Sequence, residues 1–250
     1  MQRNKTRNAI KITMRSLFLL LLVCGLMVRF WILPALQQKR IAQWVVSHQG
    51  SVGYQEELST AGKYREARYG LIGKTLGVDF VDRIAMVSLK KTDDLRVLSG
   101  LPHLQHLTVG QYMGSNLSCL EGLLHLESLT ISGSDEVDLG ALENLPSLSF
   151  LAFTNSETVD FSPLRNLRNL THLDLYGTRL VDFEDLEDLT QLEWLFLPNS
   201  ALQPADIIPL KKLVNLKSLC VGRTIFSEEG CQELQTALPN CHIEFYLSDD

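Results

Sequence analysis

A leucine recurs at almost constant spacing through the second half of this 250-residue chain. Successive members of this series stand 22 residues apart, with a single interval of 24: Leu107, Leu129, Leu151, Leu173, Leu195, Leu219 and Cys241. Each has one apolar residue three positions before it and another two positions after it. A regular period of this length indicates a stack of similar short units, in which each unit contacts its neighbours.

Each unit is predicted to contain one strand and one outer helical turn. In a strand, each leucine of this series and the residue two positions after it point to the same side. Both become buried when the neighbouring unit stacks against the strand. A second apolar pair follows with a spacing of three, which suits a helical or 3₁₀ turn: Leu120/Leu123, Leu142/Leu145, Leu164/Leu167, Leu186/Leu189 and Leu210/Leu213. We therefore expect an α/β solenoid with a parallel sheet on its concave side.

The same pattern begins upstream of Leu107. Ile84, Val87 and Leu89 match the template with a step of 20 residues. This predicts about eight parallel strands between Ile84 and Phe245, which at roughly 4.8 Å spacing would form a sheet about 34 Å across.

The position after each strand, where the backbone turns, holds a hydroxyl residue in most repeats: Ser134, Ser156, Thr178, Ser200 and Thr224. A hydroxyl there can form hydrogen bonds with the turning backbone. Tyr112 occupies the equivalent position in an earlier repeat, and Met113 to Asn116 follow no regular pattern. We expect a distorted loop at that point.

These patterns resemble bacterial leucine-rich repeat proteins of the L-x-x-L-x-x-L-x-L type with Ser or Thr at the turn. Leu234 to Ile243 is similar to the last repeat of that group. The basic start, the apolar span, the Gln37 to Trp44 helix and the segment Gly50 to Tyr54 resemble membrane-anchored members. The resemblance implies a leucine-rich repeat horseshoe that acts as a surface-presented protein-interaction domain, without shared catalytic residues.

The amino-terminal region predicts a single membrane span. Leu17 to Val28 is apolar apart from Gly25, and the apolar stretch resumes after Arg29 and ends near Leu36. About 20 helical residues cross the hydrocarbon core of a bilayer. We expect four segments: a basic cytoplasmic segment (1–16), a transmembrane helix (17–36), a juxtamembrane helix with an amino-terminal cap (37–80) and the repeats (81–250). Basic residues before the span place the repeats outside the cytoplasm.

Other interpretations of the apolar stretch remain open at this point. Its uninterrupted run of 12 residues has the length of a signal-peptide core, although no A-x-A-like cleavage site follows. A mitochondrial presequence is disfavoured because such segments are amphipathic and rich in serine. The chain could also be an intracellular leucine-rich repeat adaptor or regulatory subunit of the substrate-receptor type, in which the apolar run serves as a targeting segment.

Charge and composition narrow the classes of partner. Residues 1–33 hold six of the 23 basic residues and no acidic residue, which leaves 17 basic against 29 acidic residues, a net charge of −12, in the remainder. A nucleic-acid partner is disfavoured because phosphate binding requires a basic face. Histidines and cysteines show no close paired spacing, so we expect neither a metal nor another cofactor.

Residues that flank the core positions of each strand should face the concave side. In the middle of the array these positions are rich in aromatic and polar residues: Phe150, His172, Asp174, Tyr176, Trp194 and Phe196. Exposed aromatic clusters commonly mark an interface, so we predict a protein- or peptide-binding patch here. The alternative is that these rings pack against one another and fill space without a ligand.

Catalysis has weaker support in the sequence. His172 and Asp174 share a strand face, and Ser218 or Cys220 lies two repeats along. Two strand spacings of roughly 4.8 Å would separate a nucleophile from its base by about 10 Å, which is too far for a hydrogen bond. We therefore expect no enzyme activity, while an oxidising compartment would permit one disulfide among Cys119, Cys220 and Cys231.

Overall fold

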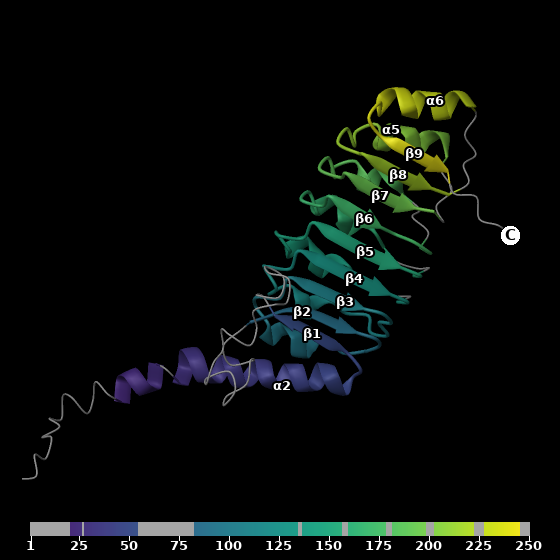
Figure 1. The fold of residues 1–250 in the computed structure, drawn as a ribbon. Coiled ribbons are helices and arrows are strands. Elements are labelled where there is room, and N and C mark those ends of the chain that lie inside the picture. The colour runs from purple at the N-terminus through teal and green to yellow at the C-terminus, as the bar shows by residue number, and fades with distance from the viewer. Residues whose placement is uncertain are drawn as a thin grey trace, which may run out of the picture.

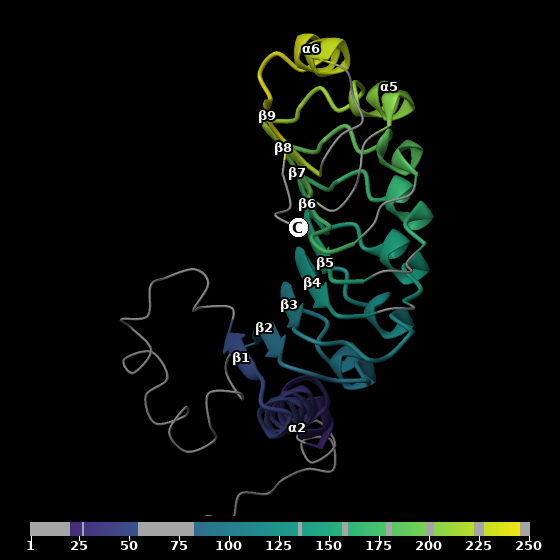
Figure 2. The same ribbon diagram turned by 90° about the vertical axis from the view of Figure 1, so that its right-hand side faces the viewer.

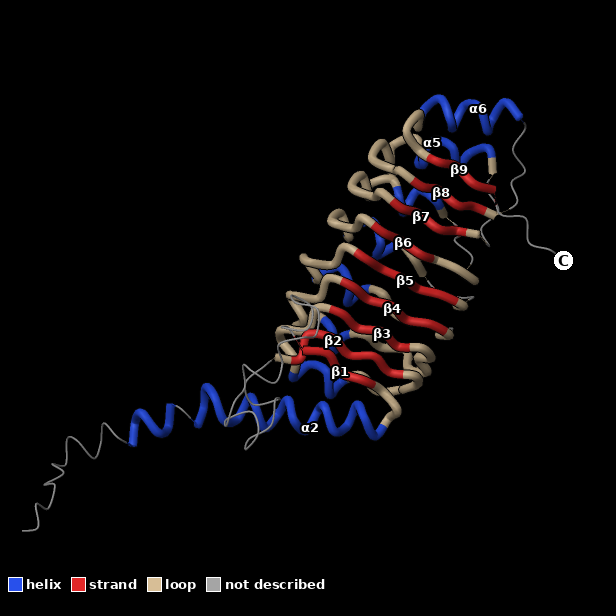
Figure 3. Tube along the Cα trace, viewed as in Figure 1, coloured by secondary structure: helices blue, strands red, loops and turns tan. Residues whose placement is uncertain are grey.

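The computed structural model describes residues 21–26, 28–54, 83–134, 137–156, 160–178, 182–198, 203–222 and 228–245. These residues contain a nine-stranded sheet with its strands in sequence order. Figure 1 and Figure 3 show the strands as successive rungs of one ladder. The strands are β1 (Ser51–Tyr54), β2 (Ile84–Leu89), β3 (His106–Val109), β4 (Ser128–Ser132), β5 (Phe150–Thr154), β6 (His172–Asp174), β7 (Trp194–Leu197), β8 (Ser218–Val221) and β9 (His242–Phe245).

The eight strands from β2 to β9 pair in parallel, as the period predicts. Their register places residues of the leucine series directly opposite one another, for example Leu107 opposite Leu129 and Leu151 opposite Leu173. Every member of the series is buried. The 22-residue spacing therefore corresponds to one turn of the solenoid, and the same side-chain position recurs on each strand.

Helical turns form the outer side of the solenoid. Figure 2 shows the strands along the concave edge and the helical turns on the opposite, convex side. The turns between consecutive parallel strands are η3 (Arg96–Gly100), η4 (Ser118–Leu120), η5 (Gly140–Asn144), η6 (Ser162–Asn166), η7 (Phe183–Leu186), η8 (Pro204–Asp206) with α5 (Ile207–Leu210), and α6 (Glu228–Ala237).

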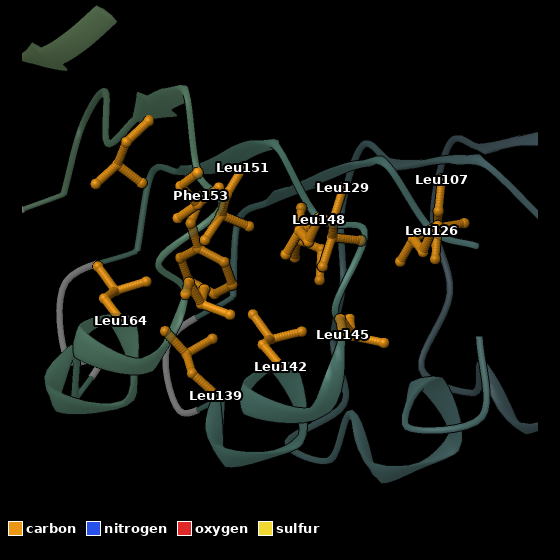
Figure 4. Packing of buried hydrophobic residues seen from close by; sticks show 14 of the residues in the cluster. Leu107, Leu126, Leu129, Leu139, Leu142, Leu145, Leu148, Leu151, Phe153 and Leu164 are labelled. Atoms are coloured by element: carbon orange, nitrogen blue, oxygen red, sulfur yellow. The ribbon is translucent and has the colours of Figure 1, made fainter. Parts of the chain in front are cut away.

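The core lies between the sheet and these outer turns. Leu142 and Leu145 extend from the outer side toward Leu148, Leu151 and Phe153 on the strand side, as Figure 4 shows. All five side chains are buried, and they belong to one apolar cluster that continues through the neighbouring repeats. Each repeat thus contributes to a common interior that it cannot bury alone.

Hydroxyl residues occupy the turn position of the described repeats. Ser134, Ser156 and Thr178 are buried there, as expected, whereas the predicted Ser200 and Thr224 lie outside the described residues. The Ser134 N–H donates to the Ser156 Oγ at 3.2 Å, and the Thr178 Oγ1 donates to the Leu175 carbonyl at 2.6 Å. These hydrogen bonds satisfy backbone groups that the turn would otherwise bury without partners.

Tyr112 fills the equivalent position with a ring. Its side chain is buried, and its hydroxyl donates to the Asn116 carbonyl at 2.7 Å. Asn116 also forms an isolated bridge with Asp138 of the next repeat. The expected irregular loop therefore wraps around the tyrosine ring and rejoins the repeat register at Asn116.

A long helix closes the amino-terminal end of the stack. The π-helical turn η1 (Val28–Ile32) leads directly into α2 (Leu33–Ser47). The second half of α2 buries Ile41, Ala42 and Val45 in the apolar cluster of the repeats. The Gln38 Oε1 accepts a hydrogen bond from the N–H of Ile84, the first residue of β2, at 3.3 Å. Helix α2 thus covers the apolar end of the core and a backbone group at its edge.

Gln49, and not the following Gly50, makes the turn that ends this helix. Gln49 adopts the left-handed conformation, with φ of 58°, directly after the helix. Gly50 is required for a different reason, since a Cβ atom added there would lie 2.4 Å from the Ser88 carbonyl oxygen. The glycine permits close contact with β2, and the long side chain of Gln49 is tolerated at the turn.

Strand β1 was not expected from the sequence. It pairs antiparallel with β2 and buries Tyr54 at its end. The repeat period could not reveal it because β1 lies outside the repeats and contains four residues. Its pairing covers the open edge of the parallel sheet. The remainder of the expected cap, residues 55–80, lies outside the described residues.

At the other end, α6 and β9 complete the stack. Leu234 and Leu238 are buried beneath α6, and Cys241 occupies a buried core position in place of leucine. All five cysteines are free thiols in the structure, so the disulfide considered among Cys119, Cys220 and Cys231 is not formed.

Burial of the leucine series yields a prediction for stability. Leu173 is fully buried at the middle of the array. Truncation to alanine should cost about 2 to 5 kcal/mol, and Leu173→Asp should cost more because it also buries an unpaired charge. We expect Leu173→Asp to abolish the cooperative thermal transition measured by circular dichroism.

Leu124, which is 54% exposed on the outer side, provides the matched control. The change Leu124→Asp should alter the free energy of unfolding by less than about 0.5 kcal/mol. A normal transition in Leu173→Asp would contradict the shared-core architecture.

Candidate binding surface

The candidate residues lie in two rows across the concave face. Strand register places Phe150 opposite His172, and His172 opposite Trp194. The second row contains Asp174, which lies opposite Phe196 on β7. The 22-residue period therefore brings residues from three separate repeats side by side, as the sequence predicts.

The aromatic side chains of these rows contact one another in a continuous series. Ring centroids are 6.0 Å apart for Phe150 and His172, and 6.4 Å apart for His172 and Trp194. Trp194 and Phe196 are stacked at 5.3 Å with 12° between their planes, and Phe196 and Tyr176 are stacked at 6.2 Å with 10° between theirs. We call this series, which joins residues of both rows, the inner aromatic row: Phe150, His172, Tyr176, Trp194 and Phe196.

The inner aromatic row stands outside the buried core. Phe150, His172, Trp194 and Phe196 are each partly exposed, and Tyr176 is 45% exposed. The rings therefore do pack against one another, as the space-filling alternative supposes, and they also present surface to solvent. Ring stacking at these distances is favourable and holds the side chains in a defined arrangement.

Tyr176 lies beyond the end of its strand, which corrects the expectation that it sits on the strand with His172 and Asp174. Strand β6 ends at Asp174, whose Oδ1 accepts the Tyr176 N–H at 2.9 Å. The Tyr176 carbonyl accepts a hydrogen bond from the Asn155 N–H at 2.8 Å. The hydrogen bond from the Tyr176 N–H to the Asp174 side chain, two residues earlier, competes with strand pairing and favours a turn.

The turn after Tyr176 depends on two residues that sequence reasoning missed. Gly177 has φ of 68°, and a Cβ atom added to it would lie 2.3 Å from the Asn155 Oδ1. Asn155 itself has φ of 55°, a conformation that asparagine tolerates better than most residues. The pairing of Asn155 and Gly177 at one 22-residue step is the sequence signal that could have indicated this support for Tyr176.

Asp174 has an unusual environment for a carboxylate. Burial raises its pKa above the ordinary value of 3.8, while the hydrogen bond from the Tyr176 N–H acts in the opposite direction. On the outer side, by contrast, hydrogen bonds from the side chain and backbone of Arg96 lower the pKa of Asp94 to about 2. Among the described residues no Lys or Arg forms an ion pair with Asp174.

Two positions expected on the concave surface are buried instead. Ala152 and Cys220 each have little exposed surface, because larger neighbours in the same row cover them. Burial raises the pKa of the Cys220 thiol, and the nearby carboxylate of Glu244 raises it further. The thiol is thus held in its protonated, weakly nucleophilic form, and β7 separates Cys220 from His172.

The rest of the concave face differs from its middle. Strands β3 and β4 present His106, Thr108, Ser128 and Thr130, which are mostly small hydroxyl residues. At the far end, β9 presents the exposed residue Glu244, which sequence reasoning did not single out although its position relative to Cys241 indicates the concave face. Among the described residues, no three His, Cys, Asp or Glu side chains are grouped as metal ligands would be.

The environment of Asp174 yields a prediction. Asp174→Asn keeps an oxygen acceptor for the Tyr176 N–H and removes the charge. Because the pKa of Asp174 is raised in the folded state, the free energy of unfolding falls as pH rises from 3.8 through the folded pKa. We therefore expect Asp174→Asn to be more stable than the natural protein at pH 7, with a flatter pH dependence in urea denaturation.

Asp160 is the control with the opposite sign. The Ser162 N–H donates to its Oδ1 at 2.9 Å and lowers its pKa. The stability that the Asp160 carboxylate contributes is present above pH 3.8 and is lost as the pH falls through the lower pKa of the folded state. Asp160→Asn should therefore be less stable than the natural protein at pH 7. A loss of stability at pH 7 in Asp174→Asn would show that the desolvation argument is wrong.

No family model matches the chain, and no curated protein matches its sequence. Among solved structures, it is similar to internalin C2 (inlC2) from Listeria monocytogenes str. 4b F2365, with a TM-score of 0.53 and 24% sequence identity over 66% of this chain and 74% of that chain. It is also similar to an internalin (inlF) from the same strain, with a TM-score of 0.51 and 22% identity over 64% of this chain and 54% of that chain. Together with the parallel sheet, these likenesses show that the chain folds as a leucine-rich repeat solenoid preceded by an apolar helix.

Proposed function

We propose that this protein binds a protein or peptide through the concave face of its repeats and that it is not an enzyme. The observation that carries the proposal is the inner aromatic row, which spans β5 to β7 and remains partly exposed. Large aromatic side chains grouped at a surface contribute much of the binding energy of protein interfaces.

The rigidity of the platform supports this proposal. Four of the rings stand on paired strands. Tyr176 lies beyond the end of β6, where its backbone N–H donates to Asp174 and its carbonyl accepts the Asn155 N–H. Little side-chain freedom remains to be lost on binding, which favours affinity. The concave face offers neither a nucleophile in contact with a base nor a grouped set of metal ligands among the described residues, so binding explains the arrangement better than catalysis.

We further propose that the amino-terminal helix anchors the repeats to a membrane. Among the described residues, the helical stretch Leu21–Ser47 is long and apolar enough to cross a bilayer. Most of its described large apolar side chains up to Leu36 are exposed, whereas Ile41 and Val45 beyond them are buried against the repeats. An exposed apolar stretch of this length requires another apolar environment.

The proposed topology follows from charge. Five basic residues precede residue 17, so the positive-inside rule places 1–16 in the cytoplasm and the repeats outside it. The proposed segments are thus a basic cytoplasmic segment (1–16), a transmembrane helix (17–36), the juxtamembrane helix and cap (37–80) and the repeats (81–250). In this arrangement the protein resembles membrane-anchored bacterial leucine-rich repeat proteins.

The binding proposal predicts the effect of removing two rings. With a photoreactive residue in place of Ser128 on the concave face, irradiation of native membranes should yield a crosslinked partner, identified by mass spectrometry. The double change Trp194→Ala and Phe196→Ala should abolish this product while the melting temperature stays close to that of the natural protein, because neither ring belongs to the buried core.

Ile208 and Val214, which are large exposed apolar residues outside the concave strands, provide a control with the same number of changes. Changing both to alanine should leave the crosslinked product intact. If the product persists without Trp194 and Phe196, the inner aromatic row is not the binding surface.

The membrane proposal predicts accessibility to protease. In intact cells, protease added outside should digest the repeats, whereas a tag fused before residue 1 should be protected until the cells are permeabilised. Protection of the repeats would instead support an intracellular adaptor whose apolar run acts as a targeting segment. Recovery of a chain that starts after residue 36 would indicate a cleaved signal peptide.

A further inference from the structure

We infer that the inner aromatic row receives an arginine side chain of the partner, with its guanidinium group at the Asp174 carboxylate and against the Tyr176 ring. The inference rests on the proposed binding function and specifies the chemistry of the segment that is bound.

Between β5 and β9, the described part of the concave face carries acidic side chains and no cationic partner for them. At the described concave positions of β5 to β9, Asp174 and Glu244 are acidic, and none is Lys or Arg. On the outer side, in contrast, charges of opposite sign on successive repeats are paired, as in Arg165 and Asp185 at 2.5 Å. A face with unpaired carboxylates selects a basic segment and repels an acidic one.

The setting of Asp174 is unfavourable for a lone carboxylate. The described residues supply it with one hydrogen-bond donor, the Tyr176 N–H at 2.9 Å. Its register neighbours are Ala152 on one side and Phe196 on the other, and neither side chain can donate a hydrogen bond. A partly desolvated carboxylate in apolar surroundings is stabilised most by a charged donor.

The adjacent rings favour a planar cation over a compact one. The planes of Tyr176 and Trp194 lie within 10° and 12° of the plane of Phe196, so the three rings share nearly one orientation. Tyr176 ends this series and is its most exposed member. A guanidinium group can lie against an aromatic face and still donate two hydrogen bonds to a carboxylate, and it loses hydration more readily than an ammonium group.

The backbone places these two groups in a fixed relation. The Asp174 carboxylate accepts the backbone N–H of Tyr176, and the Tyr176 carbonyl accepts the Asn155 N–H at 2.8 Å. The Tyr176 ring is stacked on the ring of Phe196. The carboxylate and the ring are therefore prearranged for a single cationic side chain, and no rearrangement of the turn is required on binding.

A small probe tests this inference without knowledge of the partner. The full chain is prepared in detergent micelles with fluorotryptophan, and the fluorine NMR signal of Trp194 is distinguished from those of Trp31 and Trp44 by the change Trp194→Phe. Nα-acetyl-arginine amide should shift the Trp194 signal saturably. The citrulline analogue, which has the same shape but no charge, should bind about tenfold more weakly or not at all.

Two variants locate the probe. Asp174→Asn retains the acceptor for the Tyr176 N–H and should weaken binding of the arginine probe by about tenfold, whereas Glu121→Gln, at an exposed carboxylate beside the outer turn η4, should leave binding unchanged. Equal binding of citrulline, equal binding of the lysine analogue, or unchanged binding in Asp174→Asn would overturn the inference.

The same variants separate this inference from the binding function itself. In the crosslinking assay, Asp174→Asn and an excess of the arginine probe should each reduce the product that depends on Trp194 and Phe196. If that product requires the two rings but is insensitive to both treatments, the concave face still binds a partner and the arginine inference is wrong. If the rings are not required, the binding proposal itself fails.

Discussion

The structure depends on an apolar interior that no single repeat can enclose. Leu142 and Leu145 on the outer side, with Leu148 and Leu151 on the strand side, become buried only because the neighbouring repeats supply the remaining walls. The same requirement explains the two ends, where α2 and β1 close one side and α6 closes the other. It also fixes strand register, because a shift by one residue would turn the leucines outward.

Register links stability to the proposed binding surface. When Leu151, Leu173 and Leu195 align inside the solenoid, the residues directly before and after each of them must align on the opposite face of the sheet. The aromatic series is thus held in place by the same pairing that buries the leucines. Asp174 contributes both to the fold and to the proposed binding surface. It ends β6 by accepting the Tyr176 N–H, and among the described residues its charge has no cationic partner.

The period was sufficient to predict the parallel strands, the outer helical turns, the buried hydroxyl residues and the alignment of Phe150, His172 and Trp194. The repeat period could not predict features that depend on contacts between segments of different kinds. Strand β1 follows no repeat, and the turn at Gln49 replaces the glycine that local rules favour. Burial of Ala152 and Cys220 depends on the size of their neighbours, which spacing alone does not describe.

The direction of α2 gives the solenoid two unequal edges. In Figure 1 the parallel strands β2 to β9 point roughly the same way as α2, away from its apolar amino-terminal end. With that end held in a bilayer, the beginnings of the strands would face the lipid and their ends would face the surrounding medium. Tyr176 and the Asp174 carboxylate lie at the end of β6, on the rim that the proposed anchoring places farthest from the lipid. A partner arriving from solution, or displayed on a facing cell, would then meet these two residues first.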